Sequence, residues 1–163
     1  MRLNLSGSCH CKAVTFTVQS SQPYPFNQCY CGICRKTAGS GGYAINLAAD
    51  FETLQIKGSE NISVYRAKTT DVDTGKISES TAERSFCMLC GSALWLWAPE
   101  WPALMHPHAS TIDSELPQPP QKWHMMLGSK ASWAVPIVID GDRKFDAYPD
   151  ESLTDWHDRQ AKD

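Results

Sequence analysis

The sequence predicts a mainly β protein built from short strands. Ten glycines and ten prolines among the 163 residues indicate frequent turns, which favour short strands over long helices. Val14, Phe16 and Val18 alternate with threonines, and this period of two is typical of a strand with one buried face. The length suits one hydrophobic core, so we expect residues 1–163 to form a single domain.

The remaining elements follow from shorter patterns. Strands are expected where β-branched and aromatic residues lie between turn residues, at 26–28, 43–47, 51–57, 63–68, 77–86, 93–97, 104–111 and 123–127. The apolar segment 133–139 is expected to be extended, and residues 3–8 are interpreted as a lead-in. One helical turn is expected at 35–38 and a short C-terminal helix at 152–160, with Ser152 as its cap and Asp155 at the capping-box position.

Charge and hydropathy bear on the possible partners. The net charge of -3 and the pI of about 5.9 lack the basic footprint of a nucleic-acid-binding protein. The apolar runs are short and interrupted, so no segment is expected to span a bilayer. Residues 1–8 hold one arginine and no long apolar region, which predicts no signal peptide and hence a cytoplasmic location with reduced thiols. The sequence indicates no oligomeric state.

The cysteines carry the strongest functional signal. There are seven of them, so complete disulfide pairing is impossible. They form three tight groups at steps of two or three residues, and such steps in a reducing compartment are typical of metal ligands. The groups are Cys9/Cys11, Cys29/Cys31/Cys34 and Cys87/Cys90.

The densest group has the spacing C-x-C-x-x-C. In an extended segment Cys29 and Cys31 point to one face, and a tight turn or helix start brings Cys34 toward them. Three converging thiolates leave one corner of a zinc tetrahedron open, which distinguishes a reacting site from a structural one. We therefore interpret Cys29, Cys31 and Cys34 as the ligands of a labile, catalytic zinc.

The other four cysteines complete a closed, structural set. This set, which would tie the first strand to a distant C-x-x-C-G turn, is Cys9, Cys11, Cys87 and Cys90. If residues 9–11 are extended, His10 points away from both sulfurs and is not a ligand. An alternative places two C-x-x-C pairs around one zinc, but it leaves three cysteines without a role, so the division into four and three is preferred. The alternative set is Cys31, Cys34, Cys87 and Cys90.

A zinc ion held by three thiolates carries a net charge of -1. It is therefore a weaker Lewis acid than zinc on three histidines, but it accepts a soft thiol and keeps it as the nucleophilic thiolate. This chemistry favours making or breaking carbon–sulfur bonds over hydrolysis. Arg35 and Lys36 would offset the charge or hold a substrate carboxylate, although a solvated surface pair is an equal alternative.

The histidines and tryptophans receive weaker assignments. His106 or His108 could bring an imidazole near the open zinc, but a role outside the ligand set is preferred. His124 and His157 are assigned no part in the site. The five tryptophans from residue 95 to residue 133 are expected mainly to fill the core.

Three motifs, in order along the chain, resemble the glutathione-dependent formaldehyde-activating enzyme family, which includes centromere protein V. They are the segments that begin at Gly7 (GSCHCKAV), Cys29 (CYCGICR) and Arg84 (RSFCMLCGSAL). The tail segments at 145–149 and 155–159 look like the same family. This chain departs from the usual pattern at Tyr30, where His is common, and at Lys12, where Gly is common; neither change removes a ligand.

The resemblance implies a β-tent fold of short antiparallel sheets, pinned by a structural zinc on the four-cysteine set, with short helical turns. It also implies a second, exchangeable zinc on the three-cysteine set, where the glutathione sulfur binds. The implied activity is that of a carbon–sulfur lyase or synthase, forming S-(hydroxymethyl)glutathione from glutathione and formaldehyde. The alternative is a non-catalytic glutathione carrier or a zinc-stabilised interaction module.

Overall fold

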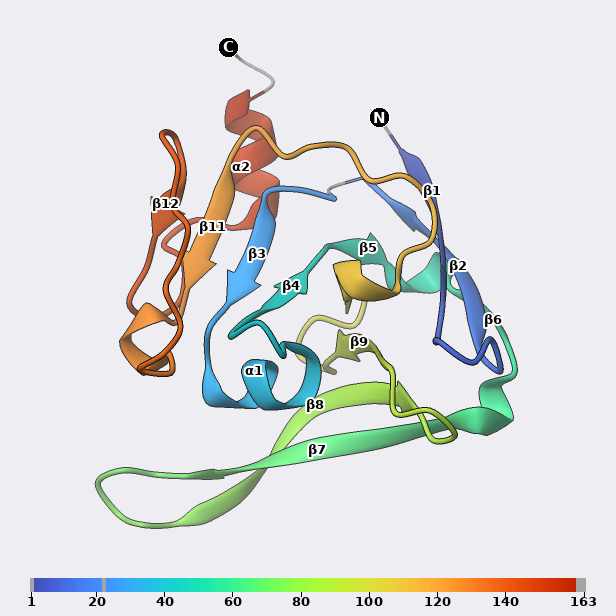
Figure 1. Cartoon of the computed structure of the whole chain (residues 1–163), viewed down its shortest axis with the longest axis horizontal. Coiled ribbons are helices and arrows are strands. Elements are labelled where there is room, and N and C mark those ends of the chain that lie inside the picture. Colours follow the sequence, from blue (N-terminus) through green and yellow to red (C-terminus); the bar gives the residue numbers. More distant parts are fainter. Residues whose placement is uncertain (1, 22, 161–163) are drawn as a thin grey trace.

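The computed structural model describes residues 2–21 and 23–160 and is mainly β, as the sequence predicts (Figure 1). Its strands form three sheets, and the first has the order β1-β2-β6. The strands of this sheet are β1 (Leu3–Ser8), β2 (Thr15–Ser20) and β6 (Gln55–Lys57). All of its strand pairs are antiparallel.

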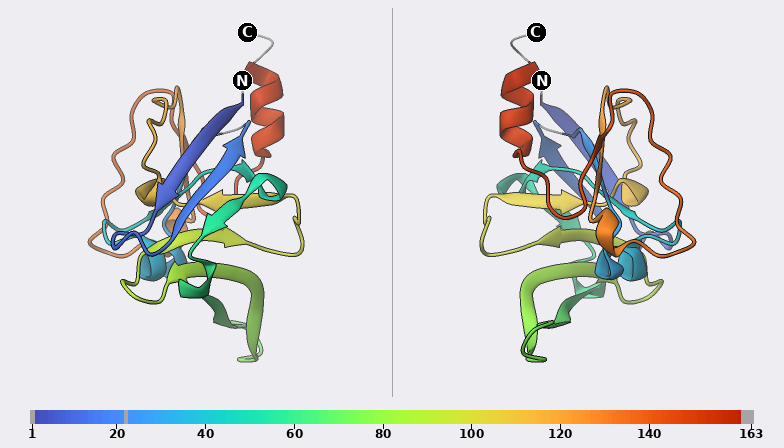
Figure 2. Two further views of the ribbon diagram at one scale, coloured as in Figure 1. Left: turned by 90° about the vertical axis from the view of Figure 1, so that its right-hand side faces the viewer. Right: turned by 90° about the vertical axis from the view of Figure 1, so that its left-hand side faces the viewer.

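The second sheet has five strands and contains the longest hairpin. Its order is β5-β10-β9-β8-β7, with β5 (Ala49–Asp50), β7 (Ile62–Thr70), β8 (Ile77–Cys87), β9 (Ala93–Trp97) and β10 (Leu104–Pro107). The tip of the β7–β8 hairpin extends beyond the rest of the molecule (Figures 1 and 2). At its other end β8 finishes at Cys87, which is followed by a turn.

The third sheet departs from the predicted antiparallel arrangement. Its order is β12-β11-β3-β4, with β3 (Phe26–Cys29), β4 (Ala44–Asn46), β11 (Lys122–Met125) and β12 (Arg143–Lys144). Strand β11 is parallel to both β3 and β12. Parallel neighbours need long crossover connections, and the stretch between β3 and β11 provides one.

Two α-helices and four 3-10 turns complete the described residues. They are α1 (Gly32–Ala38), α2 (Leu153–Gln160), η1 (Phe51–Thr53), η2 (Ser59–Asn61), η3 (Ala109–Thr111) and η4 (Leu127–Ser129). Helix α2 confirms the predicted C-terminal helix. The Ser152 hydroxyl accepts a hydrogen bond from the Asp155 backbone N–H over 3.1 Å, as the predicted cap requires. None of the helices in the described ranges is long and apolar enough to cross a membrane.

The main core lies between the first and second sheets. Phe16 and Trp95 meet edge to face, with ring centroids 5.2 Å apart, and both are almost fully buried. Buried aliphatic side chains surround them, among them Leu5, Val14, Val18 and Met105. The alternation predicted for Val14, Phe16 and Val18 is confirmed, because each points into this core.

Several predicted elements need correction. Residues 3–8 form strand β1 rather than a lead-in, since their backbone pairs with β2 along its whole length. The predicted strands 51–57 and 104–111 each divide into a 3-10 turn and a shorter strand. Segment 133–139 contributes no strand to the described sheets, and apart from the buried Ala134 it exposes its apolar side chains, including Trp133 at 59% and Val135 at 82%.

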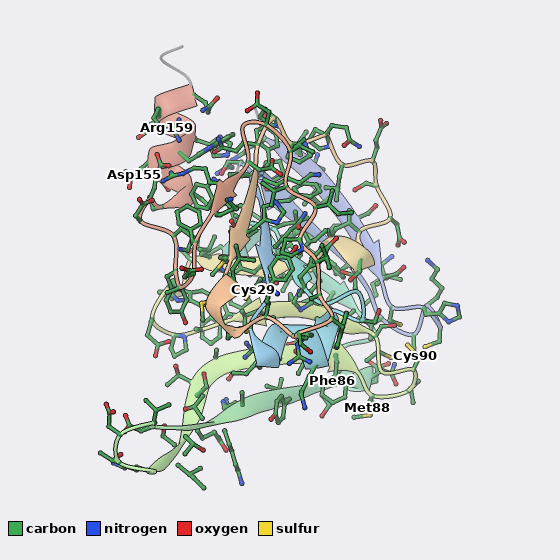
Figure 3. All side chains as sticks on the ribbon, turned by 60° about the vertical axis from the view of Figure 1, so that its left-hand side comes forward. Cys29, Phe86, Met88, Cys90, Asp155 and Arg159 are labelled. Atoms are coloured by element: carbon green, nitrogen blue, oxygen red, sulfur yellow. The ribbon has the colours of Figure 1, made fainter. Side chains whose placement is uncertain are left out.

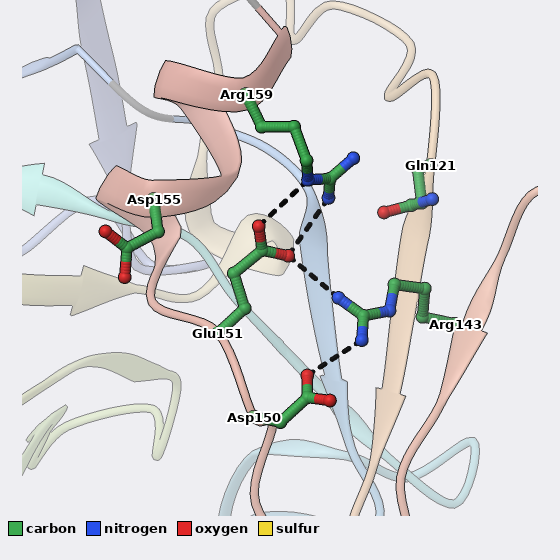
Figure 4. A pocket seen from close by; sticks show the side chains of 6 residues that line it. All are labelled: Gln121, Arg143, Asp150, Glu151, Asp155 and Arg159. Carbon is green, nitrogen blue, oxygen red and sulfur yellow. Dashed lines mark hydrogen bonds and ion pairs between the residues drawn. The ribbon is translucent and has the colours of Figure 1, made fainter.

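Helix α2 is attached to the third sheet by charged and aromatic contacts. Glu151 accepts hydrogen bonds from Arg143 and from Arg159, and Arg143 also contacts Asp150 (Figure 4). The buried Trp156 donates to the Gln121 side chain over 2.7 Å. The carboxylates in this network balance the charges of the two arginines, so we interpret the network as one that holds helix α2 in place.

Candidate metal centres

The four-cysteine cluster consists of Cys9, Cys11, Cys87 and Cys90. All four Sγ atoms lie within 4.8 Å of one another, with Cys9 and Cys11 3.6 Å apart and Cys11 and Cys87 3.8 Å apart. Zn–S bonds of about 2.3 Å at tetrahedral angles place sulfurs about 3.8 Å apart. The donor set and its spacing therefore fit a metal ion such as zinc.

Two turns bring these four sulfurs together. The chain reverses after β1, where Lys12 adopts a left-handed backbone with φ 63° and its N–H donates to the Cys9 carbonyl over 3.1 Å. The second turn follows β8, and Gly91 there has φ 77°, a conformation that glycine adopts without strain. The expectation that residues 9–11 are extended is wrong, because the turn itself brings the two sulfurs together.

Local hydrogen bonds favour the thiolate forms of Cys9 and Cys90. The Ser92 hydroxyl lies 3.2 Å from Cys90 Sγ, and together with the Cys11 backbone N–H it lowers the pKa of Cys90 to about 5. The Val14 N–H donates to Cys9 Sγ over 3.3 Å. His10 is exposed and is absent from the ligand group among the described residues, in agreement with its predicted role.

The three-cysteine cluster consists of Cys29, Cys31 and Cys34. Cys29 ends strand β3, Cys31 is the N-cap of α1, and Cys34 lies in the first turn of that helix. The Cys34 backbone N–H donates to Cys31 Sγ over 3.3 Å, so the capping interaction turns the second sulfur toward the third. The three Sγ atoms lie within 4.8 Å of one another.

This cluster fits a metal ion with one position left open. Its ligand group has three members, and the described residues add no fourth Cys, His, Asp or Glu donor. The neighbouring Cys29 and Cys34 thiols lower the pKa of Cys31, and Cys31 in turn raises that of Cys29. Hydrogen bonds from the two neighbouring thiols thus favour the thiolate form of Cys31. Figure 3 shows Cys29 in the middle of the molecule and Cys90 at its periphery.

Two polar side chains that the sequence interpretation missed contact Cys34. Asn46 Nδ2 and Arg84 Nη2 each lie 3.9 Å from its Sγ. His108 Nδ1 is 3.1 Å from Asn46 Oδ1, so His108 lies one residue behind the cluster and outside the ligand group. Burial, followed by the charge of Arg84, lowers the pKa of His108 to about 4. Arg84 is the first residue of the third sequence motif, and this position was the signal in the sequence that could have identified it.

A buried hydrogen-bonded chain supports the loop from the other side. The Tyr30 hydroxyl, from the residue between the first two ligands, lies 3.3 Å from Gln28 Oε1 and 3.3 Å from His124 Nδ1. His124 Nε2 then lies 3.0 Å from Asp142 Oδ2, and both of these side chains are at least 99% buried. His124 therefore has a structural role in the site, which the sequence analysis did not assign to it.

Arg35 and Lys36 line a cavity of about 740 Å³ between α1 and the turn after β1. Lys12 and Asp113 lie on its other side. Arg35 Nε is buried without a hydrogen-bond partner among the described residues, whereas Lys36 is exposed. Cys9 of the four-cysteine cluster is also among the lining residues, and the link from this cavity to the three-cysteine cluster runs through Arg35, which follows Cys34 in α1.

The sequence model named "Glutathione-dependent formaldehyde-activating enzyme" matches residues 4–127. The chain belongs to this family. A Halomonas elongata protein described as "Putative glutathione-dependent formaldehyde-activating enzyme" is 53% identical over 155 residues, which are 95% of each chain. A crystal structure of a Rhodobacter sphaeroides protein matches with a TM-score of 0.51 and 25% identity over 72% of this chain and 92% of that one.

The glutathione-dependent formaldehyde-activating family match covers both clusters. Every cysteine and the three polar residues around Cys34 fall within residues 4–127. Asp142, which completes the buried chain from Tyr30, lies beyond the matched range. The resemblance identified from the three motifs is confirmed.

Proposed function

We propose that this protein is a zinc-dependent carbon–sulfur lyase or synthase that acts on the aldehyde adduct of glutathione or a similar thiol, as an S-(hydroxymethyl)glutathione synthase does. The observation that carries the proposal is the three-cysteine cluster, where three sulfurs converge within 4.8 Å without a fourth donor of the same types among the described residues. The four-cysteine cluster would hold a structural zinc. Family membership supports glutathione and formaldehyde as substrates.

The three cysteines would hold the zinc at which the carbon–sulfur bond forms. Cys29, Cys31 and Cys34 would hold the labile zinc, which when bound keeps a thiol as its thiolate at neutral pH. The thiolate sulfur donates an electron pair to the aldehyde carbon, and the C–S bond forms as the carbonyl π electrons move to oxygen. That oxygen takes a proton from water, and the reverse sequence releases the aldehyde.

Arg35 and Lys36 would orient the thiol. Glutathione carries two carboxylates, and the cavity beside α1 places these two cations near the helix that contains Cys34. The buried, unpartnered Nε of Arg35 favours an anion there, since an unsatisfied buried donor is costly. Orientation of this kind contributes to rate by reducing the entropy lost on reaching the reacting geometry.

Thiol–aldehyde exchange measured by NMR tests this proposal. The zinc-loaded wild type should accelerate exchange between glutathione and formaldehyde, and Cys31→Ser should reduce the rate to that of the uncatalysed mixture. Arg66→Gln is the control, because Arg66 is exposed on β7, is paired with Glu83, and does not line the cavity beside α1. Equal rates for wild type and Cys31→Ser would refute the enzymatic proposal, and tight glutathione binding without acceleration would favour the non-catalytic carrier.

A further inference from the structure

Arg84 is a partly buried cation without a carboxylate partner in the described structure. It lies on β8, and the ion pairs among the described residues do not include it. Its Nη1 atom is buried and has no hydrogen-bond partner there, while Nη2 lies 3.9 Å from Cys34 Sγ. A guanidinium withdrawn from water needs a counter-charge, and the Cys34 sulfur, which Arg84 contacts, can supply one as a thiolate.

Asn46 reaches the same sulfur but carries no charge. Its Nδ2 lies 3.9 Å from Cys34 Sγ, and its Oδ1 is held by His108 at 3.1 Å. Asn46 and His108 also form a β-bridge through their backbones. Cys34 therefore contacts two nitrogen donors at the same distance, one neutral and one positively charged. This allows the effect of charge to be separated from that of hydrogen bonding.

The charge of Arg84 bears on what the open position accepts. Three thiolates around a divalent zinc ion have a net charge of -1, and a fourth thiolate raises this to -2. An adjacent guanidinium reduces these sums to 0 and -1. Charge interactions are stronger away from bulk water. Arg84 therefore stabilises the cluster with a bound thiolate, at -2, more than the cluster with a neutral ligand, at -1.

We propose that Arg84 is the positioning residue that makes the three-cysteine cluster selective for an anionic sulfur ligand. It acts through Cys34 and the field at the open position, and it need not touch the substrate. An incoming thiol binds as thiolate, gives its proton to solvent and displaces a neutral ligand. This inference rests on the proposed function and assigns the preference for thiols to a residue outside the ligand set.

The test compares ligand binding by the cobalt-substituted protein, whose sulfur-to-metal charge-transfer band reports on the cluster. The probes are 2-mercaptoethanol, which binds as an anion but has no carboxylate, and imidazole, which binds as a neutral ligand. Arg84→Gln keeps an N–H donor and removes the charge, while Arg84→Lys keeps the charge. Arg66→Gln on the neighbouring strand is the matched control, since Arg66 is exposed and paired with Glu83.

We expect Arg84→Gln to raise the Kd for 2-mercaptoethanol about 10- to 100-fold, the range seen for residues that support metal ligands, with little change for imidazole. Arg84→Lys should keep most of the thiol affinity. Asn46→Ala should leave the thiol-to-imidazole affinity ratio unchanged, which provides a test if Arg84→Gln does not fold.

Two results would overturn the inference. The first is an unchanged thiol-to-imidazole affinity ratio in Arg84→Gln, whether both affinities stay the same or fall together. The second is a ratio in Asn46→Ala as low as the one expected for Arg84→Gln. A wild type that binds no thiol would refute the proposed function itself, whereas a wild type that binds thiol without help from Arg84 would refute only this inference.

Discussion

The two cysteine clusters have opposite surroundings. In the four-cysteine cluster Cys11 and Cys90 are exposed at the tips of turns, and the set of four donors is complete. In the three-cysteine cluster Cys29 and Cys34 are buried at 4% and 5% exposure, and donors from Asn46 and Arg84 reach Cys34. The complete donor set thus has two exposed members beside the buried Cys9 and Cys87, whereas the incomplete set has no exposed member.

This difference indicates what each cluster can do. A complete tetrahedron has no position for a substrate, so exposure gives it no reactivity, and its value lies in joining distant parts of the chain. An incomplete tetrahedron reacts, and enclosure makes its charge balance sensitive to neighbouring residues. The number of cysteine ligands therefore distinguishes a structural site from a reactive one. The burial of the reactive site determines how strongly neighbouring residues change its charge balance.

The largest expected effect is the loss of folding when the four-cysteine cluster, but not the three-cysteine cluster, loses a ligand. Cys87→Ser should abolish folding, because a structural zinc contributes on the order of 10 kcal/mol, comparable with the whole stability of a domain of this size. Cys31→Ser should keep the fold, since its cluster joins residues only six positions apart or fewer. Circular dichroism with zinc analysis checks this. A folded Cys87→Ser variant or an unfolded Cys31→Ser variant would remove the distinction.

A smaller effect is expected where the three-cysteine cluster is supported from behind. Asp142→Ala should cost about 1–3 kcal/mol, because it leaves the buried His124 Nε2 without its hydrogen-bond partner. Asp150→Ala is the control, since Asp150 pairs with Arg143 but is 71% exposed, and such a pair contributes at most about 1 kcal/mol. Urea unfolding in excess zinc measures both values. Equal losses in the two variants would show that the buried chain does not support the loop.

Part of the pH dependence of stability should arise at His108, behind the three-cysteine cluster. Burial lowers the pKa of His108 to about 4, below its usual value of about 6.5, so the fold favours neutral imidazole. Its stabilisation is complete above pH 6.5 and is lost as the pH falls toward 4. One pH unit below 6.5, at about pH 5.5, the loss should be about 1.4 kcal/mol.

Urea unfolding at pH 7.5 and at pH 5.5 tests this titration. His108→Asn, which can still donate to Asn46, should lose about 1.4 kcal/mol less than the wild type between these values. The control is His10→Asn, at the exposed position beside the four-cysteine cluster, which should follow the wild type. If His108→Asn also follows the wild type, the pH effect lies elsewhere.

Much of the metal chemistry could be predicted from the sequence because it is local. The spacing from Cys29 to Cys34 limits how far these sulfurs can separate, and counting seven thiols favours the division into four and three. The structure places the four-cysteine cluster together, which excludes the alternative that joined Cys31 and Cys34 to Cys87 and Cys90. The strands at 14–18 and 93–97 could also be predicted from the sequence, since each has a clear pattern of apolar and aromatic residues.

Other features depend on contacts that leave no local pattern. Strand β1 has a polar, glycine-containing sequence and is formed by pairing with β2. The parallel pairing of β3 with β11 joins residues nearly a hundred positions apart, and it is what brings His124 to Tyr30. Arg84 was within a motif, but only the fold shows that it faces Cys34 rather than the four-cysteine cluster beside it in sequence.

The most direct test is the zinc content of the purified protein, measured by native mass spectrometry during chelator challenge with and without glutathione. Two zinc ions per chain are expected, of which the chelator removes one rapidly, and glutathione should slow that removal by filling the open position. A single zinc ion, or two ions lost at the same rate whether or not glutathione is present, would contradict the account.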